Sequence, residues 1–330
     1  MDIPLSDILR ALRVVSIPTR TRFRGITTRE AALVRGPEGW SEFSPFPEYS
    51  DAEAATWLAA AINFGWHPQP APLRDTVAVN ATVPAIAADR VAELLARFPG
   101  CHTVKVKVAE AGHTRDDDYA RVLAVRRALG EDGNVRVDAN GGWSVAEAEA
   151  ALTRLAPLRL EYAEQPVATV AGLEALRARL AGSGLLIAAD ESVRKASDPL
   201  DVARRRAADI LVVKAQPLGG IRAALRIAEQ AGLPIVVSSA LDTSVGLSMG
   251  ALLAASLPTQ DFAAGLGTAA LLAGDVTEHP LLPVGGEIPV SRVTPSERML
   301  DRFAATPERS LWWRERIVRC YTVLAERPAG

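Results

Sequence analysis

Several features are scarce in this sequence of 330 residues, and each scarcity excludes a class of protein. The only two cysteines, Cys101 and Cys320, are far apart and lack metal-site spacing, so we expect two reduced thiols rather than a disulfide framework. No apolar stretch reaches the roughly 18 residues of a membrane-spanning helix. The net charge of −2 gives no electrostatic reason to expect nucleic acid or an anionic membrane as a partner.

A targeting segment is also missing from the amino-terminal residues. The first ten residues lack a basic stretch followed by an apolar core, so we expect no signal peptide and a cytoplasmic location. The hydrophobic content of 48% is ordinary for a globular protein. The length allows one large barrel domain and one smaller domain.

Predicted strands and helices alternate through the middle of the chain. The strands span residues 77–82, 103–108, 135–138, 160–164, 185–190, 209–214, 234–238 and 262–267. The helices between them span residues 85–97, 116–129, 170–180, 199–206, 219–231 and 244–255, and a further helix begins at Ser144. Because parallel strands need helical crossovers, this order predicts an α/β fold, a (β/α)7β modified TIM barrel without a clear eighth helix. An open doubly wound sheet is the alternative, but it would not bring the strand ends around one centre.

The first 75 residues do not follow this alternation. Strands are predicted at residues 12–17, 30–35 and 40–43, and a helix at residues 51–64. Strands followed by a helix indicate a separate α+β domain.

The end of the chain leaves the alternation again. Helices are predicted at residues 296–304 and 310–326, after a turn-rich segment. We expect this tail, residues 280–330, to pack against the N-terminal segment 1–75 and complete a capping domain. Residues 76–279 would form the catalytic barrel.

Three carboxylates close three consecutive predicted strands. Asp138, Glu164 and Asp190 follow one another at a constant spacing of 26 residues. The C-terminal ends of barrel strands converge on one face, where the chemistry of such barrels takes place. Converging carboxylates repel one another unless a cation binds them, and hard oxygen ligands suit Mg²⁺. The sequence therefore predicts a magnesium site, although acids at strand ends also serve as helix caps or loop residues.

Three lysines are predicted to join these carboxylates. Lys105 and Lys107 alternate with valines on one strand, so both point to the same face, which is the barrel interior if the valines face the helices. Lys214 closes the strand after Asp190, on the opposite side of the barrel from Lys107. The alternatives are a half-exposed strand carrying solvated lysines, and a structural salt bridge between Lys214 and Asp190.

This combination predicts a specific kind of chemistry. A lysine beside a metal ion and another lysine has a lowered pKa and can act as a base. Mg²⁺ can bind a substrate carboxylate and stabilise the charge that develops when its α-proton leaves. The combination fits proton abstraction next to a carboxylate, followed by racemisation, cycloisomerisation or β-elimination.

Five short motifs carry a family resemblance. These are Lys105-Val106-Lys107, Asp138-Ala139-Asn140, Glu164-Gln165-Pro166, Asp190-Glu191-Ser192, and Lys214 with Gly219-Gly220. Together they resemble the enolase superfamily, and within it the muconate-lactonizing subgroup, over nearly the whole chain. The resemblance implies that the three carboxylates bind Mg²⁺, with Mn²⁺ as a possible substitute. It also implies that Lys107 and Lys214 form the acid/base pair and that Lys105 binds the substrate carboxylate.

A narrower resemblance concerns the reaction. Residues 21–26, 45–49 and 238–241 resemble a dehydratase of menaquinone synthesis within that subgroup. The implied reaction is a syn elimination of water from a cyclohexadiene carboxylate, which leaves an aromatic ring. Lys107 would take the α-proton, and Lys214 would face the other side of the ring. Alternatives on the same site are N-acylamino acid racemase, dipeptide epimerase and muconate cycloisomerase; a metal-free binding or scaffold protein is the alternative from another class.

Five further residues are candidates for contact with a small-molecule carboxylate substrate. Arg22 and Arg24 fall in the loop that covers the active site in this superfamily, and arginine pairs well with carboxylates. Ser238 and Ser239 could donate hydrogen bonds to substrate or cap a helix, and Gly265 would let the last strand approach the ligand closely. The sequence leaves open whether the protein is a monomer or a homo-oligomer.

Overall fold

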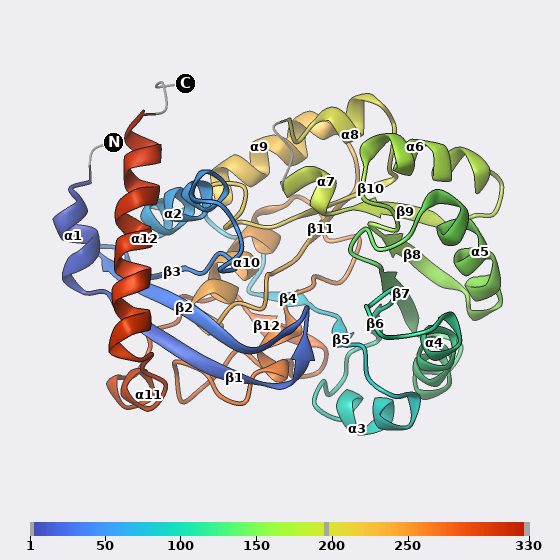
Figure 1. Cartoon of the computed structure of the whole chain (residues 1–330), viewed down its shortest axis with the longest axis horizontal. Helices are drawn as coiled ribbons and strands as arrows, with labels where there is room; N and C mark the ends of the chain where they lie inside the picture. The colour runs from blue at the N-terminus through green and yellow to red at the C-terminus, as the bar shows by residue number, and fades with distance from the viewer. Residues whose placement is uncertain (1–2, 195–197, 327–330) are drawn as a thin grey trace.

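The computed structural model describes residues 3–194 and 198–326. Figure 1 shows two parts side by side: a curled parallel sheet surrounded by helices, and a smaller part built on an antiparallel sheet, which we call the cap. Both cysteines are free thiols, as expected. Within the described ranges, no helix combines the length and the apolar character needed to cross a membrane.

Seven parallel strands form the barrel sheet. Each strand lies beside the strands that precede and follow it in the chain. They are β5 (Ala81–Val83), β6 (Thr103–Lys107), β7 (Asn134–Asp138), β8 (Leu160–Glu164), β9 (Leu186–Ala189), β10 (Ile210–Val213) and β11 (Ile235–Val237). Neighbouring strand ends lie in register, since Lys107 pairs with Asp138 and Asp138 with Glu164. The residues predicted at the strand ends therefore lie in a row at one end of the barrel.

The expected eighth strand is reduced to two bridging residues that close the barrel. Ala264 accepts a backbone hydrogen bond from Asn80 at 2.9 Å, and Gly265 donates one to Val237 at 2.8 Å. A Cβ atom at Gly265 would lie 2.5 Å from the Ser238 Oγ, so only glycine allows this approach.

Helices cover the outside of the barrel. They are η1 (Ala88–Arg90), α3 (Val91–Leu95), α4 (Arg115–Leu129), α5 (Val145–Leu155), η2 (Ala156–Leu158), α6 (Val170–Arg179), α7 (Glu191–Arg194), α8 (Asp201–Arg204), α9 (Ile221–Ala231), α10 (Ser244–Ser256) and η3 (Gly267–Leu271). Capping boxes begin α4, from Thr114 to Asp117, and α5, from Ser144 to Glu147. These local signals explain why both helices start where the sequence predicts.

The cap combines both ends of the chain. Its elements are α1 (Leu5–Arg10), β1 (Arg13–Phe23), β2 (Ile26–Gly36), β3 (Gly39–Phe43), α2 (Asp51–Trp66), α11 (Glu297–Arg302) and α12 (Pro307–Glu326). Helix α12 packs on α2 and α1, as Figure 1 shows. Arg316 of α12 donates hydrogen bonds to the carbonyl oxygens of Phe46 and Tyr49, and Trp313 donates one to Glu30. The expected packing of the tail on the N-terminal segment is confirmed.

Three local predictions differ from the structure. The strand expected at residues 77–82 divides into β4 (Thr76–Ala78) and β5, because β4 pairs with β12 (Glu287–Pro289) of the tail. The helix expected at residues 199–206 is only the four-residue α8. Helix α7 was not predicted and begins directly after Asp190.

Candidate active site

Six charged side chains gather at the C-terminal end of the barrel strands. Strand β6 carries Lys105 and Lys107, and β7 and β8 end at Asp138 and Glu164. Asp190 and Lys214 directly follow β9 and β10. These six residues are at most 6% exposed, so six ionisable groups lie in the interior of the protein. We call these six residues the charged ring.

Each amine of the charged ring contacts a carboxylate. Lys105 Nζ lies 2.9 and 3.0 Å from the two Glu164 oxygens and 3.3 Å from Asp138 Oδ2. Lys107 Nζ lies 2.5 Å from the same Asp138 oxygen, and Lys214 Nζ lies 2.5 Å from Asp190 Oδ2. Buried charges are tolerated only when they are paired and hydrogen-bonded, which these contacts provide.

The two lysines predicted as an acid/base pair lie on opposite sides of the barrel. Strands β7, β8 and β9 separate β6 from β10 in one direction. Strand β5, the bridging residues Ala264 and Gly265, and β11 separate them in the other. A planar molecule held between Lys107 and Lys214 would therefore meet one amine on each face.

Burial and charge shift the pKa values of the three amines in different directions. Burial lowers the pKa of Lys107, and the neighbouring Lys105 and Arg24 add to the decrease against the opposing effect of Asp138. Burial also lowers the pKa of Lys214, helped by Arg194. For Lys105, burial acts in the same direction, but the carboxylates of the ring outweigh it and raise the pKa. Lys107 and Lys214 are therefore the amines that lose a proton more readily.

The carboxylates also differ from one another. Burial and the nearby Asp138 carboxylate raise the pKa of Glu164 to about 7. Burial would raise the pKa values of Asp138 and Asp190 too, but their lysine partners outweigh it and hold both below the usual range. The charged ring thus holds two firmly ionised acids and one acid that titrates near neutrality.

Further side chains hold the charged ring in place. Asn140 accepts a hydrogen bond from Lys107 Nζ at 2.8 Å. Gln165 accepts hydrogen bonds from the backbone N–H groups of Asp190 and Ser192 at 2.9 and 3.1 Å. These contacts fix the position of the acid that follows β9.

Arg194 links the charged ring to the cap. Its Nε donates to Asp190 Oδ1 at 3.2 Å, its Nη2 to Glu191 at 2.7 Å, and its Nη1 to the Tyr49 hydroxyl at 3.0 Å. Tyr49 belongs to the loop between β3 and α2, so one guanidinium joins the two parts of the molecule. The short helix α7 places Arg194 one turn after Asp190.

The cap closes the space over the charged ring. A cavity of about 30 Å³, which we call the inner cavity, lies between the ring and Phe23, Arg24 and Phe46 of the cap. The Arg24 guanidinium lies 5.0 Å from the centre of the Phe46 ring, and Lys107 Nζ lies 5.4 Å from that of Phe23. A space of this size holds about one water molecule, so an organic substrate requires the cap residues to move.

The structure brings most of the predicted substrate residues to the inner cavity. Arg24, Ser238, Ser239 and Gly265 line it, and the Ser239 hydroxyl donates to the Gly265 carbonyl at 2.9 Å. Arg22 lies outside this lining and is exposed. Arg22 still lies on β1, whereas Arg24 stands in the turn after it with a positive φ of 48°, so the two arginines do not share a face as they would on a continuous strand.

The donor chemistry of the charged ring fits a hard divalent cation. Asp138, Glu164 and Asp190 are each 1% exposed and supply only carboxylate oxygens. Across residues 3–194 and 198–326, no three Asp, Glu, His or Cys side chains already enclose one point. The reason is that lysine amines bind the oxygens of all three acids, and an ammonium group and a divalent cation compete for the same oxygens.

Several residues of this region were missed by sequence reasoning. Asn140, Arg194 and Tyr49 received no role, although Asn140 stands two residues after Asp138 and Arg194 four residues after Asp190. Those short spacings are a usable local signal. Tyr49 has none, because its partner Arg194 lies 145 residues away.

Comparisons with known proteins place this arrangement in a class. The family model "Enolase N-terminal domain-like" matches residues 14–65, and "Enolase C-terminal domain-like" matches residues 87–295. The cap sheet and the barrel with its charged ring thus correspond to the two halves of an enolase-like protein.

Relatives define the family more narrowly. Proteins named o-succinylbenzoate synthase from Mycolicibacterium smegmatis and Mycobacterium tuberculosis are each 54% identical to this chain, over 97% of it and over 98% and 97% of their own lengths. The protein of that name from Mycobacterium leprae is 53% identical over 97% of this chain and 94% of its own. The chain belongs to the o-succinylbenzoate synthase family of the enolase superfamily.

Solved structures support the fold. A muconate lactonizing enzyme gives a TM-score of 0.72 at 21% identity, covering 89% of this chain and 98% of the other. An N-succinyl Arg/Lys racemase from Bacillus cereus gives 0.73 at 20% identity, covering 89% and 97%. At these identities the likeness concerns the fold alone.

Proposed function

We propose that the chain removes water from 2-succinyl-6-hydroxy-2,4-cyclohexadiene-1-carboxylate to give o-succinylbenzoate, a step of menaquinone synthesis. The chain is an enzyme, a carbon–oxygen lyase acting on a small molecule. The observation that carries this proposal is the 54% identity, over 97% of the chain, to proteins named o-succinylbenzoate synthase. The opposed lysines of the charged ring are the groups that such a reaction requires.

Lys107 is the proposed base. Its pKa is lowered mainly by burial, so the amine can be free of its proton and accept one at Nζ. It would take the proton from the carbon next to the substrate carboxylate, and the electrons of that C–H bond would pass into an enediolate. The hydroxyl group on the adjacent carbon would then leave with the same proton as water. Because the α-proton and the hydroxyl group leave from the same face of the ring, the elimination is syn. The new double bond completes the aromatic ring.

Lys214 and Lys105 have proposed supporting roles. Lys214 approaches from the opposite side of the barrel, where its ammonium group would face the π-system of the ring. Lys105, whose pKa is raised by the carboxylates around it, stays charged and would neutralise the substrate carboxylate. Arg24 lines the inner cavity from the cap and would contact the succinyl carboxylate.

The proposed cofactor is a divalent cation. Enolase-superfamily sites use a Lys or His base together with Mg²⁺. Asp138, Glu164 and Asp190 would hold Mg²⁺ here, or Mn²⁺ in its place, because their carboxylate oxygens suit hard cations. When bound, the cation supplies positive charge for the carboxylate whose α-proton leaves. A cytoplasmic location and the oligomeric state stay predictions.

An assay with the purified chain tests the reaction. With Mg²⁺ and the cyclohexadiene acid, we expect o-succinylbenzoate to form, and Lys107→Ala to lower kcat by about 10²–10⁴-fold because the proton acceptor is lost. Arg127→Gln, a change on the exposed side of α4, is the control and should keep full activity. Full activity of Lys107→Ala would refute the assignment of the base, and no product from the unaltered chain would refute the reaction.

One observation favours a second candidate activity on the same site. Lysines on opposite sides of the barrel also suit racemisation, in which one amine removes the α-proton and the other returns one to the opposite face. Incubation of N-acylamino acids with the chain in D₂O tests it. Deuterium uptake without dehydration of the diene would establish the racemase and exclude the dehydratase.

A further inference from the structure

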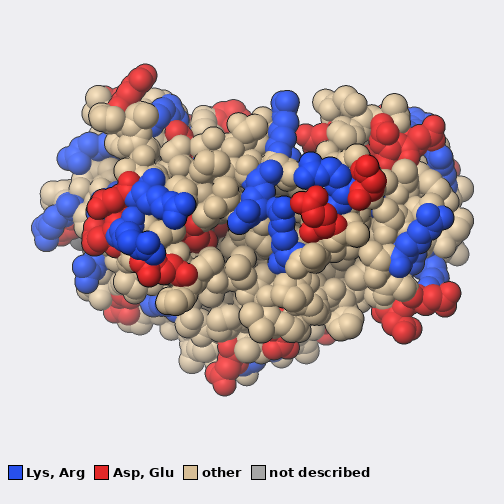
Figure 2. Space-filling model, turned by 90° about the horizontal axis from the view of Figure 1, so that it is seen from below, with Lys and Arg blue, Asp and Glu red and all other residues tan. Residues whose placement is uncertain are grey.

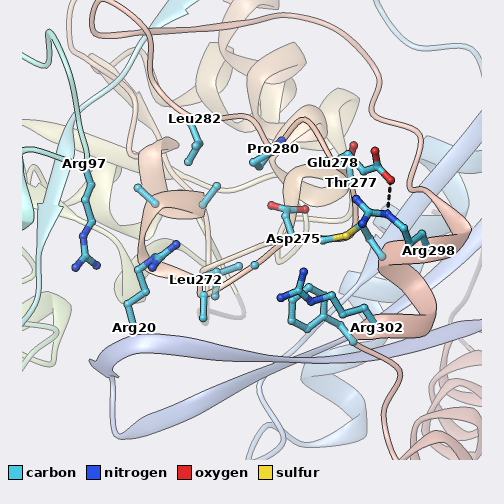
Figure 3. Close-up of a pocket in the computed structure, with 16 residues that line it drawn as sticks. Arg20, Arg97, Leu272, Asp275, Thr277, Glu278, Pro280, Leu282, Arg298 and Arg302 are labelled. Carbon is cyan, nitrogen blue, oxygen red and sulfur yellow. Dashed lines mark hydrogen bonds and ion pairs between the residues drawn. The ribbon is translucent and has the colours of Figure 1, made fainter.

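A second cavity lies beside the inner cavity and is large enough for a small molecule. Its volume is about 570 Å³, within the range of about 300–1,000 Å³ typical of ligand sites. It lies between the end of β1, the turn after α3, η3 and the helix α11 (Figure 3). We call it the arginine pocket, because Arg20, Arg97, Arg298 and Arg302 line it.

The acidic groups of the arginine pocket are already engaged. Glu278 accepts a hydrogen bond from Arg298 Nε at 2.7 Å, drawn as a dashed line in Figure 3. Asp275 is buried and accepts from the backbone N–H and the hydroxyl of Ser244, at 3.1 and 2.8 Å. Glu278 is therefore paired with Arg298, whereas Asp275 accepts from Ser244 and, among the described residues, from none of the four arginines.

The other three arginines have donors that no acceptor in the described part of the chain binds. Arg20 and Arg302 are exposed and, within residues 3–194 and 198–326, have no ion pair and no side-chain hydrogen bond. Arg97 contacts Glu93 at 3.3 Å through Nη2, while its Nη1 is buried without a partner in the described part of the chain. A buried N–H group without an acceptor is rare in folded proteins and indicates a missing partner.

The arrangement of these donors suggests the shape of the partner. Figure 3 shows Arg20 and Arg97 on one side of the arginine pocket and Arg302 on the other, with Leu272 between them. In the view from below, Lys and Arg side chains gather at the middle of the face, with Asp and Glu side chains beside them (Figure 2). Arginine pairs with planar anions through two parallel hydrogen bonds. A ligand with two separated anionic groups joined by an apolar body would pair with the arginines on both sides of the arginine pocket and pack on Leu272 between them.

We propose that the arginine pocket binds a small organic dianion, with one acidic group at Arg20 and Arg97 and the other at Arg302. The apolar body of the ligand packs on Leu272 and on Phe303. This site is separate from the charged ring, because none of the six charged-ring residues lines it.

The arginine pocket shares two elements with the inner cavity. Strand β1 places Arg20 in the pocket and Phe23 in the inner cavity. Helix η3 places Ala269 in the pocket and Thr268 in the inner cavity. A ligand that holds Arg20 therefore also restrains the hairpin that covers the charged ring, and amide hydrogen exchange of residues 18–26 should slow on binding.

Calorimetric titration with terephthalate tests the site. This probe carries carboxylates at opposite ends of a rigid ring, and benzoate, with one carboxylate, is the comparison ligand. We expect terephthalate to bind more tightly than benzoate. In the double variant Arg20→Gln/Arg302→Gln, the Kd for terephthalate should rise at least tenfold. The control Arg127→Gln/Arg226→Gln alters two exposed arginines on α4 and α9 and should leave the Kd unchanged.

Three results would overturn the proposal. They are no terephthalate binding at millimolar concentration, equal binding by the double variant and the unaltered chain, and loss of binding in Lys214→Ala with retention in the double variant. The last would place the probe in the charged ring instead. Since binding and hydrogen exchange are measured without turnover, failure here is distinguishable from failure of the proposed dehydration.

Discussion

The two halves of the barrel interior carry different side chains. On β6 and β7 the inward positions hold Lys105, Lys107 and Arg136, all buried. From β8 to β11 an apolar cluster fills the interior, consisting of Tyr162, Ala188, Ile210, Val212 and Val236. The first half is therefore built from charge pairs, and the second from packing, apart from Glu164, Asp190 and Lys214 at its C-terminal end.

Arg136 shows the condition under which the charged half is tolerated. Its Nε donates to Glu161, and its Nη1 donates to the Asn80 side chain at 3.1 Å and to the Ala263 carbonyl at 2.7 Å. Its guanidinium also stacks 4.6 Å from the centre of the Tyr162 ring, where the two halves meet. Charge pairs of this kind add little net stability, but removing one partner is costly. The comparison predicts that a substitution in the charged half destabilises the fold by leaving a charged or polar group without its partner. A substitution in the apolar half destabilises it by removing buried side-chain volume.

The largest effect on folding is expected from breaking a pair in the charged half. Arg136→Met leaves the partly buried Glu161 and the buried Asn80 without their donor, which should lower the free energy of unfolding by about 3–5 kcal/mol. Urea denaturation measures the loss. The matched variant Arg136→Met/Glu161→Gln removes both charges and should recover part of it; a double variant no more stable than the single one would contradict the account.

Glu42, a buried acid between the cap and the barrel, should make the free energy of unfolding depend on pH. Burial and the neighbouring Asp242 raise the pKa of Glu42 to about 7, above about 4.5 in the unfolded chain. The folded state then binds the proton more tightly, so this contribution to stability is complete below about pH 4.5 and is lost as the pH rises through 7. The loss amounts to about 3 kcal/mol.

Unfolding curves between pH 4.5 and 8 check this prediction. The difference in unfolding free energy between the unaltered chain and Glu42→Gln should change across that interval, because glutamine does not titrate. A constant difference would show that Glu42 titrates normally, with the hydrogen bonds that it accepts from Ser44 and Thr243 offsetting the effect of burial.

A smaller loss is expected in the apolar half. Val212→Ala removes buried methyl groups facing Tyr162 and Ile210 and should cost about 2 kcal/mol, from lost burial and the cavity left behind. Thermal and urea unfolding measure it. Since no charge changes, the pH dependence of unfolding should match that of the unaltered chain, and an altered profile would refute the separation of the two halves.

The smallest effect is expected at the border between the halves. The Tyr162 hydroxyl is buried and has no hydrogen-bond partner in the described part of the chain. Tyr162→Phe keeps the ring against Arg136 and removes the unpaired group, so the free energy of unfolding should change by less than about 1 kcal/mol and toward greater stability. A clear destabilisation in the same denaturation assay would mean that the hydroxyl has a partner.

Local patterns explain which features the sequence predicts well. The alternation of lysine with valine around Lys105 and Lys107 determines the inward face of β6, since side chains alternate along any strand. The even spacing of Asp138, Glu164 and Asp190 becomes one row because parallel strands in register end together. These properties need no information from distant parts of the chain.

Tertiary contacts explain what sequence reasoning missed. The Tyr49–Arg194 contact joins segments far apart in the sequence, and the arginine pocket combines residues from both ends of the chain. The eighth strand is reduced to Ala264 and Gly265, which pair with segments about 185 and 27 residues earlier in the chain. The domain boundaries at residues 75/76 and 279/280, like the roles of the individual site residues, stay predictions.

The construction of the cap from both ends of the chain has a consequence for synthesis. Helix α12 packs against α1, and Tyr321 donates a hydrogen bond to the carbonyl of Ile3 at 2.9 Å. During translation the amino-terminal strands are made first, yet their packing partner α12 is made after all the barrel strands. The cover over the reactive end of the barrel is therefore finished after the barrel strands themselves have been made. A nascent chain acquires a closed active site only once α12 has left the ribosome.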